Sequence, residues 1–498
     1  MKKLTIVTIS AFAIMAAASA AFSAEVKTEP TSQDMQMKNG SWTELARLYP
    51  VAYVEQNVSD ELTPEKLASW WDVFGDPTMT ELITRALAKN RDLASARASV
   101  KEARYQLGIS EANLLPWLDA NGSWNNVRTS PEAGGSGSAL QYIGLGLDAT
   151  WEIDIFGGQR ASVRAQRATL ESQYAMLYST WSSLAAEVAM DYISLRTLQE
   201  QLDIANYNVG LQEETVSIQQ SRVDAGLADS LTLNQAKYTL EQTRATIPTI
   251  LASIEQTKNA LAILTGEIPG TLEEELAEHK PVPRVESTAL IGIPANAIRQ
   301  RPDIRQAERA LAAQIARKKA ARADLWPKFY LTGAIGTQAH EGSLFNGPGK
   351  MYSFLPQISW PIFHAGAITK NIKVQGAKAE QLLAAYEQTV LNAVGEVRDA
   401  LSDNVQEYER NARLKSGVDA AQTALDLANE KYSKGLVDFT NVINAQSALA
   451  SLSEQYVLSG GQISTNAVRL FKALGGGWKP LDEAERALAE AAAAKKKK

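Results

Sequence analysis

The stretch Tyr142–Phe156 reads YIGLGLDATWEIDIF, and its residues alternate between two kinds of side chain. The odd positions, from Ile143 to Ile155, are apolar, whereas the even positions are mostly Gly, Asp, Thr or Glu. A period of two over this length predicts a β-strand with one apolar and one polar face. Such strands are typical of transmembrane β-barrels, in which each strand needs ~9–11 residues to cross the bilayer. Taken alone, the pattern also fits one face of a soluble sandwich.

Three further segments show the same alternation, namely Leu118–Trp124, Phe329–Ile335 and Phe354–Ile362. Loops rich in Gly and Ser, Ser130–Leu140 and Glu341–Lys350, divide the segments into two pairs, so we expect two hairpins. Four strands cannot close a barrel, since the smallest has about eight, and unpaired edges are not tolerated in lipid. Strands that enter a membrane must therefore come from several chains that share one barrel. Two chains would give about eight strands filled by side chains, and three would give about twelve with room for a lumen.

The chain is a duplication of one unit. A nearly constant offset of about 210 positions places Asn90–Leu93 on Arg301–Ile304, and identities continue at almost the same offset along both halves. Chance identities would scatter over many offsets. Residues 80–266 and 290–475 are therefore predicted to be two copies of one structural unit.

Each copy is predicted to contain a helix, a hairpin and then two long helices. Apolar residues between Leu170 and Leu202 recur at steps of three and four, which is the stripe of a packed helix. Residues 159–223 contain no Pro, so the helix would be roughly 95 Å long and would have to pack beside others as a coiled coil or tube. Pro248 is expected to kink the next helix or end a segment of it. The predicted hairpins cover 116–156 and 327–363, and the predicted long helices cover 159–223, 228–265, 366–432 and 437–474.

The first residues have the pattern of a secretory signal peptide. Two lysines precede the apolar run Leu4–Ala18, and small residues follow it, so cleavage after Ala20 or Ala24 and export by the signal peptidase I route are expected. No later stretch is apolar for long enough to form a membrane-spanning helix. The formal net charge of −6 argues against a nucleic-acid partner.

The composition also excludes several kinds of chemistry. The chain has no cysteine, so disulfides, thiolate metal sites and lipid attachment through Cys are excluded. Its three histidines, His279, His340 and His364, are far apart in sequence, so no metal site and no cofactor are expected. The sequence also lacks a nucleophile elbow, a Walker lysine loop and a zinc helix, so we expect no catalytic residues and no enzyme activity.

The motifs in combination resemble a known family. Ser69–Pro77, with the sequence SWWDVFGDP, resembles the amino-terminal signature of outer-membrane efflux proteins, and Leu290–Gly336 resembles their most distinctive stretch. The segments Arg222–Ala236 and Lys431–Ala445 resemble the helix-turn motif of the two family repeats, although copy one has Val223 where a tyrosine is usual. The chain thus resembles the TolC-like outer-membrane factors, and most closely the NodT-like subgroup that serves resistance-nodulation-division pumps.

The resemblance implies a mainly α fold with transmembrane β-structure. In a homotrimer, each chain would contribute four strands to a twelve-stranded outer-membrane barrel, while its long helices would form a periplasmic α-barrel. Residues 25–80 and 267–290 would belong to an equatorial belt, and 476–498 would be a carboxy-terminal tail. The function implied is a passive, gated exit channel for drugs or other small solutes. Its partners would be a periplasmic adaptor (membrane fusion protein), an inner-membrane pump and outer-membrane lipid.

Candidate site residues lie at the predicted helix turns and on the second strand. Gly226 and Gly435 would allow each helix to reverse, and Asp229 and Asp438 would cap the next helix or bond across the tip. Several relatives place acidic residues in a pore constriction at positions that correspond here to asparagines. The remaining candidates are the constriction residues Thr440, Asn441 and Asn444, the basic gate partners Arg222, Lys431 and Lys434, and the lumen-facing strand acids Asp148, Glu152 and Asp154.

Three other interpretations remain open at this stage. The exit duct of a type I protein secretion system would have the same fold and differ only in its partners. A soluble periplasmic coiled-coil adaptor or structural protein would lack membrane strands, so the alternating segments count against it. A secreted enzyme is disfavoured because no catalytic constellation is present.

Overall fold

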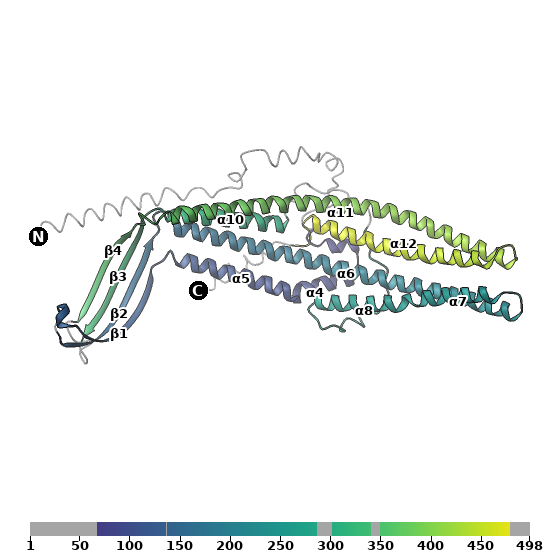
Figure 1. The fold of residues 1–498 in the computed structure, drawn as a ribbon, viewed down its shortest axis with the longest axis horizontal. Helices are drawn as coiled ribbons and strands as arrows, with labels where there is room; N and C mark the ends of the chain where they lie inside the picture. Colours follow the sequence, from purple (N-terminus) through teal and green to yellow (C-terminus); the bar gives the residue numbers. More distant parts are fainter. Residues whose placement is uncertain (1–66, 136, 286–300, 340–348, 479–498) are drawn as a thin grey trace, which may run out of the picture. The chain divides into compact units, whose positions relative to one another are not determined.

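The computed structural model describes residues 67–135, 137–285, 301–339 and 349–478, which consist mainly of helices with a single four-stranded sheet (Figure 1). All of these residues belong to one unit, Ser59–Lys498. The elements, in chain order, are η2 (Trp70–Phe74), α4 (Pro77–Lys89), α5 (Arg91–Ala112), β1 (Trp117–Arg128), η3 (Pro131–Ala133), β2 (Ala139–Ile153), α6 (Gly158–Asp224), α7 (Ser230–Arg244), α8 (Thr246–Leu264), α10 (Pro302–Ala323), β3 (Lys328–Ala339), β4 (Lys350–Ser359), α11 (Ala367–Ser433) and α12 (Phe439–Ala473).

The sheet has the order β1-β2-β3-β4, and every neighbouring pair is antiparallel. The central pairing of β2 with β3 joins the hairpins of the two copies. In the register of the sheet, Leu147 on β2 pairs with Ala120 on β1 and with Ile335 on β3. Ile335 in turn pairs with Tyr352 on β4. Because directly paired residues share a face, one face of the sheet is predominantly apolar across all four strands, with Thr337 and Lys350 as polar exceptions beside Leu145. The two-faced strands predicted from the alternation are therefore confirmed.

The last strand is shorter than the sequence pattern suggests. The alternation extends to Ile362, but β4 ends at Ser359, so Trp360 lies after the strand. Pro361 explains the difference, because it has no N–H group to donate to a neighbouring strand. The Trp360 indole N–H instead donates to the Leu325 carbonyl at 3.2 Å.

Two pairs of side-chain hydrogen bonds recur at equivalent places in the two copies. Trp151 donates its indole N–H to the Leu114 carbonyl at 2.9 Å, which is the counterpart of the Trp360 bond. Asn90 donates its side-chain amide to the Leu264 carbonyl at 3.0 Å, and Arg301 donates to the equivalent Ala473 carbonyl at 2.8 Å. The duplication seen in the sequence is thus repeated in three dimensions.

The two longest helices, α6 and α11, have 67 residues each and would each extend about 100 Å. Helix α10 packs against both of them, and α12 packs along α11. The helix predicted over 228–265 is divided at Ala245 into α7 and α8. Pro248 lies in the first turn of α8, where its missing N–H removes the bond to the Arg244 carbonyl and favours a break there.

The main hydrophobic core surrounds η2, α4 and the middle of α6. Trp70 is fully buried and stacks on Phe471 with ring centroids 5.6 Å apart. The Tyr192 hydroxyl donates to Asp76 at 2.8 Å, and burial raises the pKa of Tyr192 to about 12. The fully buried Arg196 lies 4.8 Å from the Tyr192 ring centroid. Trp70 therefore has a packing role in this core.

Candidate functional site

The polar face of the sheet brings acidic side chains from two strands together. Asp148 on β2 lies directly opposite Asp119 on β1, and it accepts a hydrogen bond from the Asn121 side chain. Glu152 lies on the same face, opposite Tyr330. Asp119 was not among the residues singled out from the sequence. The β1–β2 register, which only the structure provides, identifies it as the cross-strand partner of Asp148.

Asp154, the third predicted strand acid, lies beyond the end of β2 and binds the beginning of α6. Its carboxylate accepts bonds from the backbone N–H groups of Gln159 (3.2 Å) and Arg160 (2.8 Å), and from the Arg160 guanidinium at 3.2 Å. These bonds satisfy N–H groups in the first turn of α6, which have no partner within the helix. Asp154 therefore connects the strand to the helix rather than extending the row of strand acids.

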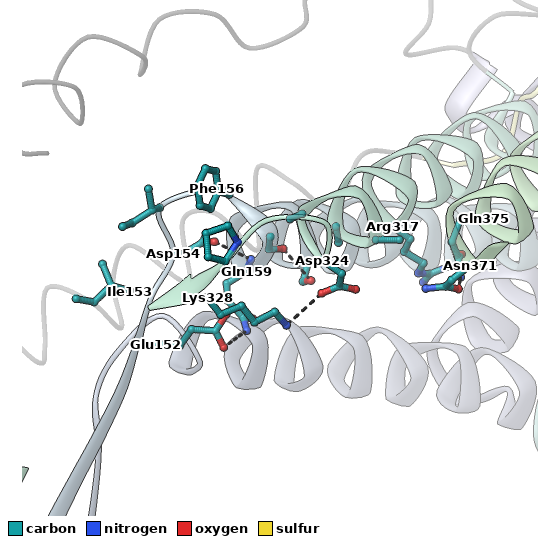
Figure 2. Close-up of a pocket in the computed structure, with 17 residues that line it drawn as sticks. Glu152, Ile153, Asp154, Phe156, Gln159, Arg317, Asp324, Lys328, Asn371 and Gln375 are labelled. Atoms are coloured by element: carbon teal, nitrogen blue, oxygen red, sulfur yellow. Dashed lines mark hydrogen bonds and ion pairs between the residues drawn. The ribbon is translucent and has the colours of Figure 1, made fainter. Parts of the chain in front are cut away.

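A cavity of about 350 Å³ lies where β2 and β3 meet α6, α10 and α11 (Figure 2). Side chains of both charges line it and pair with one another. Lys328 forms an ion pair with Asp324 at 3.1 Å, and Gln159 donates to Glu152 at 3.3 Å. No cluster of metal-ligating side chains is present in the described part of the chain. The cavity therefore has the character of a polar joint between sheet and helices that carries both charges.

The two helix turns have the same backbone structure. Gly226 and Gly435 have φ values of 69° and 71°, in the left-handed region that glycine adopts without strain. In each turn the glycine N–H bonds to the carbonyl three residues back, and the next N–H, from Leu227 or Leu436, bonds five residues back. This pattern is the Schellman ending of a helix.

The aspartates that follow the two glycines differ in their contacts. Asp229 accepts a bond from the Leu231 N–H at 3.0 Å and so caps α7. Asp438 occupies the equivalent position before α12, but its side chain makes no capping bond. The Asp438 carbonyl instead accepts bonds from the backbone N–H and the side-chain amide of Asn441, at 3.0 and 3.1 Å. The expected capping bond is thus present at Asp229 and absent at Asp438.

The predicted basic partners bind groups other than these aspartates. The Arg222 guanidinium lies over the Tyr432 ring, 4.7 Å from its centroid, and the Tyr432 hydroxyl donates to Gln219 at 3.1 Å. Lys434 forms an ion pair with Glu430 on its own helix, while Lys431 is exposed. Arg222 and Tyr432 therefore join the tip of copy one to the tip of copy two, a contact between distant residues that the sequence pattern did not reveal.

The proposed constriction residues all project from the first turns of α12. Thr440, Asn441 and Asn444 are exposed. Thr232 and Gln235, the copy-one counterparts of the two asparagines, are half-buried. Asn441 and Asn444 are three residues apart and so share one face of the helix. This face presents neutral amides, which can narrow a passage and donate hydrogen bonds but carry no charge.

In the part of the chain that the structure describes, no helix is both long and apolar enough to span a bilayer. The duplicated chain, the long helices, the two-faced sheet and the polar helix tips are the features expected of an outer-membrane efflux channel. The chain belongs to the outer membrane efflux protein family, whose model matches residues 82–267 and 293–476.

Named relatives agree with this assignment. The chain is 32% identical over 419 residues to the toluene efflux pump outer membrane protein TtgF of Pseudomonas putida, covering 82% of this chain and 85% of TtgF. It is 30% identical over 418 residues to the cation efflux system protein CusC of Escherichia coli K12, covering 82% and 89%. The solved outer-membrane channel OprN superimposes with a TM-score of 0.81 at 31% identity, covering 86% and 96%.

These similarities confirm the predicted family and fold class. The chain is an outer-membrane efflux channel, and the family consists of conduits without enzyme activity. The sequence prediction that this is not an enzyme is therefore confirmed by the family.

Proposed function

We propose that this chain is the exit channel of a tripartite efflux pump, working as a homotrimer. The observation that carries the proposal is the open sheet: among the described residues, β1 and β4 each have one edge without a partner strand, and one face of the sheet is predominantly apolar. Free edges in lipid leave backbone groups without partners, so β4 of one copy would pair with β1 of the next. Three copies would give about twelve strands, enough to enclose a lumen.

The polar face of the sheet would line that lumen. Asp119, Asp148 and Glu152 would give it a negative potential, and no group on this face needs to react for a solute to pass. The long helices would continue the passage into the periplasm. Export through the signal peptide, cleaved after Ala20 or Ala24, would deliver the chain to the outer membrane, where the sheet alone would hold it because no cysteine is available for lipidation.

The gate would lie at the two helix tips, where a periplasmic adaptor and an inner-membrane pump would dock. Asp229 and Asp438 have no basic partner within the described part of the chain, so their carboxylates are available to neighbouring copies. Arg222, Lys431 and Lys434 would supply the opposite charge around the ring. Asn441 and Asn444 would narrow the passage without forming a strong cation site. Pairs at such exposed positions contribute only ~0–1 kcal/mol each, so a partner could open the ring.

The solute would be a small molecule taken up by the pump. Among the relatives, TtgF is named for toluene efflux and CusC for cation efflux. Organic solutes are the better match here, because the tips present Thr and Asn rather than the Met, Cys or His that soft metal ions prefer.

The test is purification of the mature chain in detergent, followed by native mass spectrometry and recordings in planar bilayers. A trimer that inserts, conducts weakly at rest and copurifies with an adaptor would support the proposal. A monomer that stays soluble without detergent would overturn it. Copurification with a protein-secretion transporter would instead favour the type I secretion system.

A further inference from the structure

We propose that a basic and aromatic pocket on α10 binds the headgroup of an anionic phospholipid in the periplasmic leaflet of the outer membrane. The pocket has a volume of about 550 Å³ and is lined by Lys318, Lys319, Arg322, Phe156 and Trp326, together with Ile315 and Ala323. Three of these side chains are cationic and none is anionic. The inference rests on the proposed insertion of the sheet in the membrane.

The pocket occupies the exposed face of α10. Ile315, Lys319, Arg322 and Trp326 recur at steps of four and three, so they form one stripe. The opposite side of the helix faces the polar cavity of Figure 2, which residues of α6 and α11 also line. Since α10 packs against both α6 and α11 of its own chain, its exposed stripe lies in the middle of the protomer and away from the edges at which copies would meet.

The aromatic side chains place the pocket on the lipid-facing side. Phe156 stacks on Trp326 with centroids 5.3 Å apart, and it lies 6.4 Å from Phe329. Phe329 is paired with Ile153 and Ile358, so it belongs to the apolar face of the sheet. Figure 2 draws Phe156 at the upper end of the cavity that Glu152 and Lys328 line further down, so Phe156 borders both this cavity and the basic pocket. The pocket thus continues the apolar face just beyond the ends of β2 and β3.

The three cations are available to a ligand. Unlike Lys328, which is paired with Asp324, none of them forms an ion pair with a described carboxylate. Lys318 lies beside α11, where its Nζ atom is 3.4 Å from the position that a Cβ at Gly376 would take, an ordinary contact distance. Aromatic side chains mark the membrane interface, and basic pockets beside them bind phosphate-containing headgroups. The combination fits a lipid phosphate with acyl chains lying along the apolar face.

The test compares lipid binding by two triple variants of the full chain in native mass spectrometry. The first is Lys318→Gln, Lys319→Gln and Arg322→Gln. The second is a matched control, Lys237→Gln, Arg413→Gln and Lys415→Gln, which removes the same charge from exposed or ion-paired positions elsewhere on the helices. We expect the wild type and the control to bind phosphatidylglycerol in preference to phosphatidylcholine.

The pocket variant should lose that preference. A cation near an anionic lipid surface contributes about fivefold in binding, so the loss for three is on the order of a hundredfold. Equal phosphatidylglycerol binding by both variants would overturn the inference, and so would displacement of the lipid by inorganic phosphate alone. The same spectra report the trimer, so a wild type that forms trimers without lipid preference refutes only this site, whereas a failure to form trimers refutes the proposed function.

Discussion

The contact between Arg222 and Tyr432 gives a quantitative prediction about the gate. It joins the tips of the two copies, so separating the tips must break it. A cation–π contact is worth ~0.5–1 kcal/mol at an exposed site and ~2 kcal/mol when desolvated. Arg222 is half-buried, and its Nε atom is buried without a hydrogen-bond partner among the described residues, so we take about 1.5 kcal/mol per chain. That energy corresponds to about a tenfold change in an equilibrium constant.

Arg222→Gln should therefore raise the resting open probability about tenfold if one tip opens by itself, and about a thousandfold if three tips open together. Single-channel recording in planar bilayers measures this directly. Tyr432→Leu removes the same contact and also the hydroxyl bond to Gln219, so its effect should be at least as large. The double variant should resemble Tyr432→Leu alone, because Arg222→Gln then has no remaining contact with Tyr432 to remove. Lys415→Gln, which removes an exposed cation elsewhere on α11, is the control.

Two results would refute this reasoning. Fully additive effects of Arg222→Gln and Tyr432→Leu would mean that the residues act through different partners. Unchanged conductance in all three variants, with trimers intact, would mean that opening leaves the two tips of a chain together.

Three further predictions concern the helices and the lumen. Burial is the larger cause, and the negative charge of the nearby Glu187 the smaller, of a rise in the pKa of Asp191 from 3.8 to about 6. The folded state therefore favours the protonated carboxyl group, and the protein loses stability as the pH rises across that interval. Asp191→Asn should accordingly raise the free energy of unfolding at pH 7.5 by about 1 kcal/mol after allowance for partial exposure, and leave it unchanged at pH 3.5. Thermal unfolding at the two pH values measures the difference. Trp70→Ala should destabilise the chain by ~3–5 kcal/mol, measured by denaturant unfolding, whereas Trp70→Phe should cost less. Asp119→Asn with Asp148→Asn should reduce cation selectivity in reversal-potential measurements; an unchanged reversal potential would place these residues outside the conducting path.

Much of the fold could be predicted because its signals are local and periodic. The strand Tyr142–Phe156 and the stripe of α6 each repeat a pattern over many residues, and the duplication provides each pattern twice. The two-faced sheet and the long helices follow from these patterns. The end of β4 was missed because one residue, Pro361, overrides an alternation that continues past it.

The details of the candidate site depend on contacts that no local pattern encodes. Asp119 is identified only by the strand register, which places it opposite Asp148. Tyr432 is identified only by its contact with Arg222, which lies on a helix more than 200 residues earlier in the sequence. Asp229 and Asp438 occupy equivalent positions, yet only Asp229 makes the capping bond. The gating roles of the tip residues remain predictions until conductance is measured.

The divergence between Asn90 and Arg301 has a consequence for how far each copy tolerates substitution at this joint. Both side chains hold an equivalent carbonyl, but Asn90 is neutral, whereas Arg301 also pairs with Asp303 and Glu396, each at 2.7 Å. The Arg301 side chain is only 8% exposed, so salt screens these two ion pairs weakly. A neutral side chain in place of Arg301 would leave two carboxylates without their cation, whereas the bonds that Asn90 makes in the described part of the chain are to backbone groups. The same joint, built twice, therefore depends on charge in copy two alone.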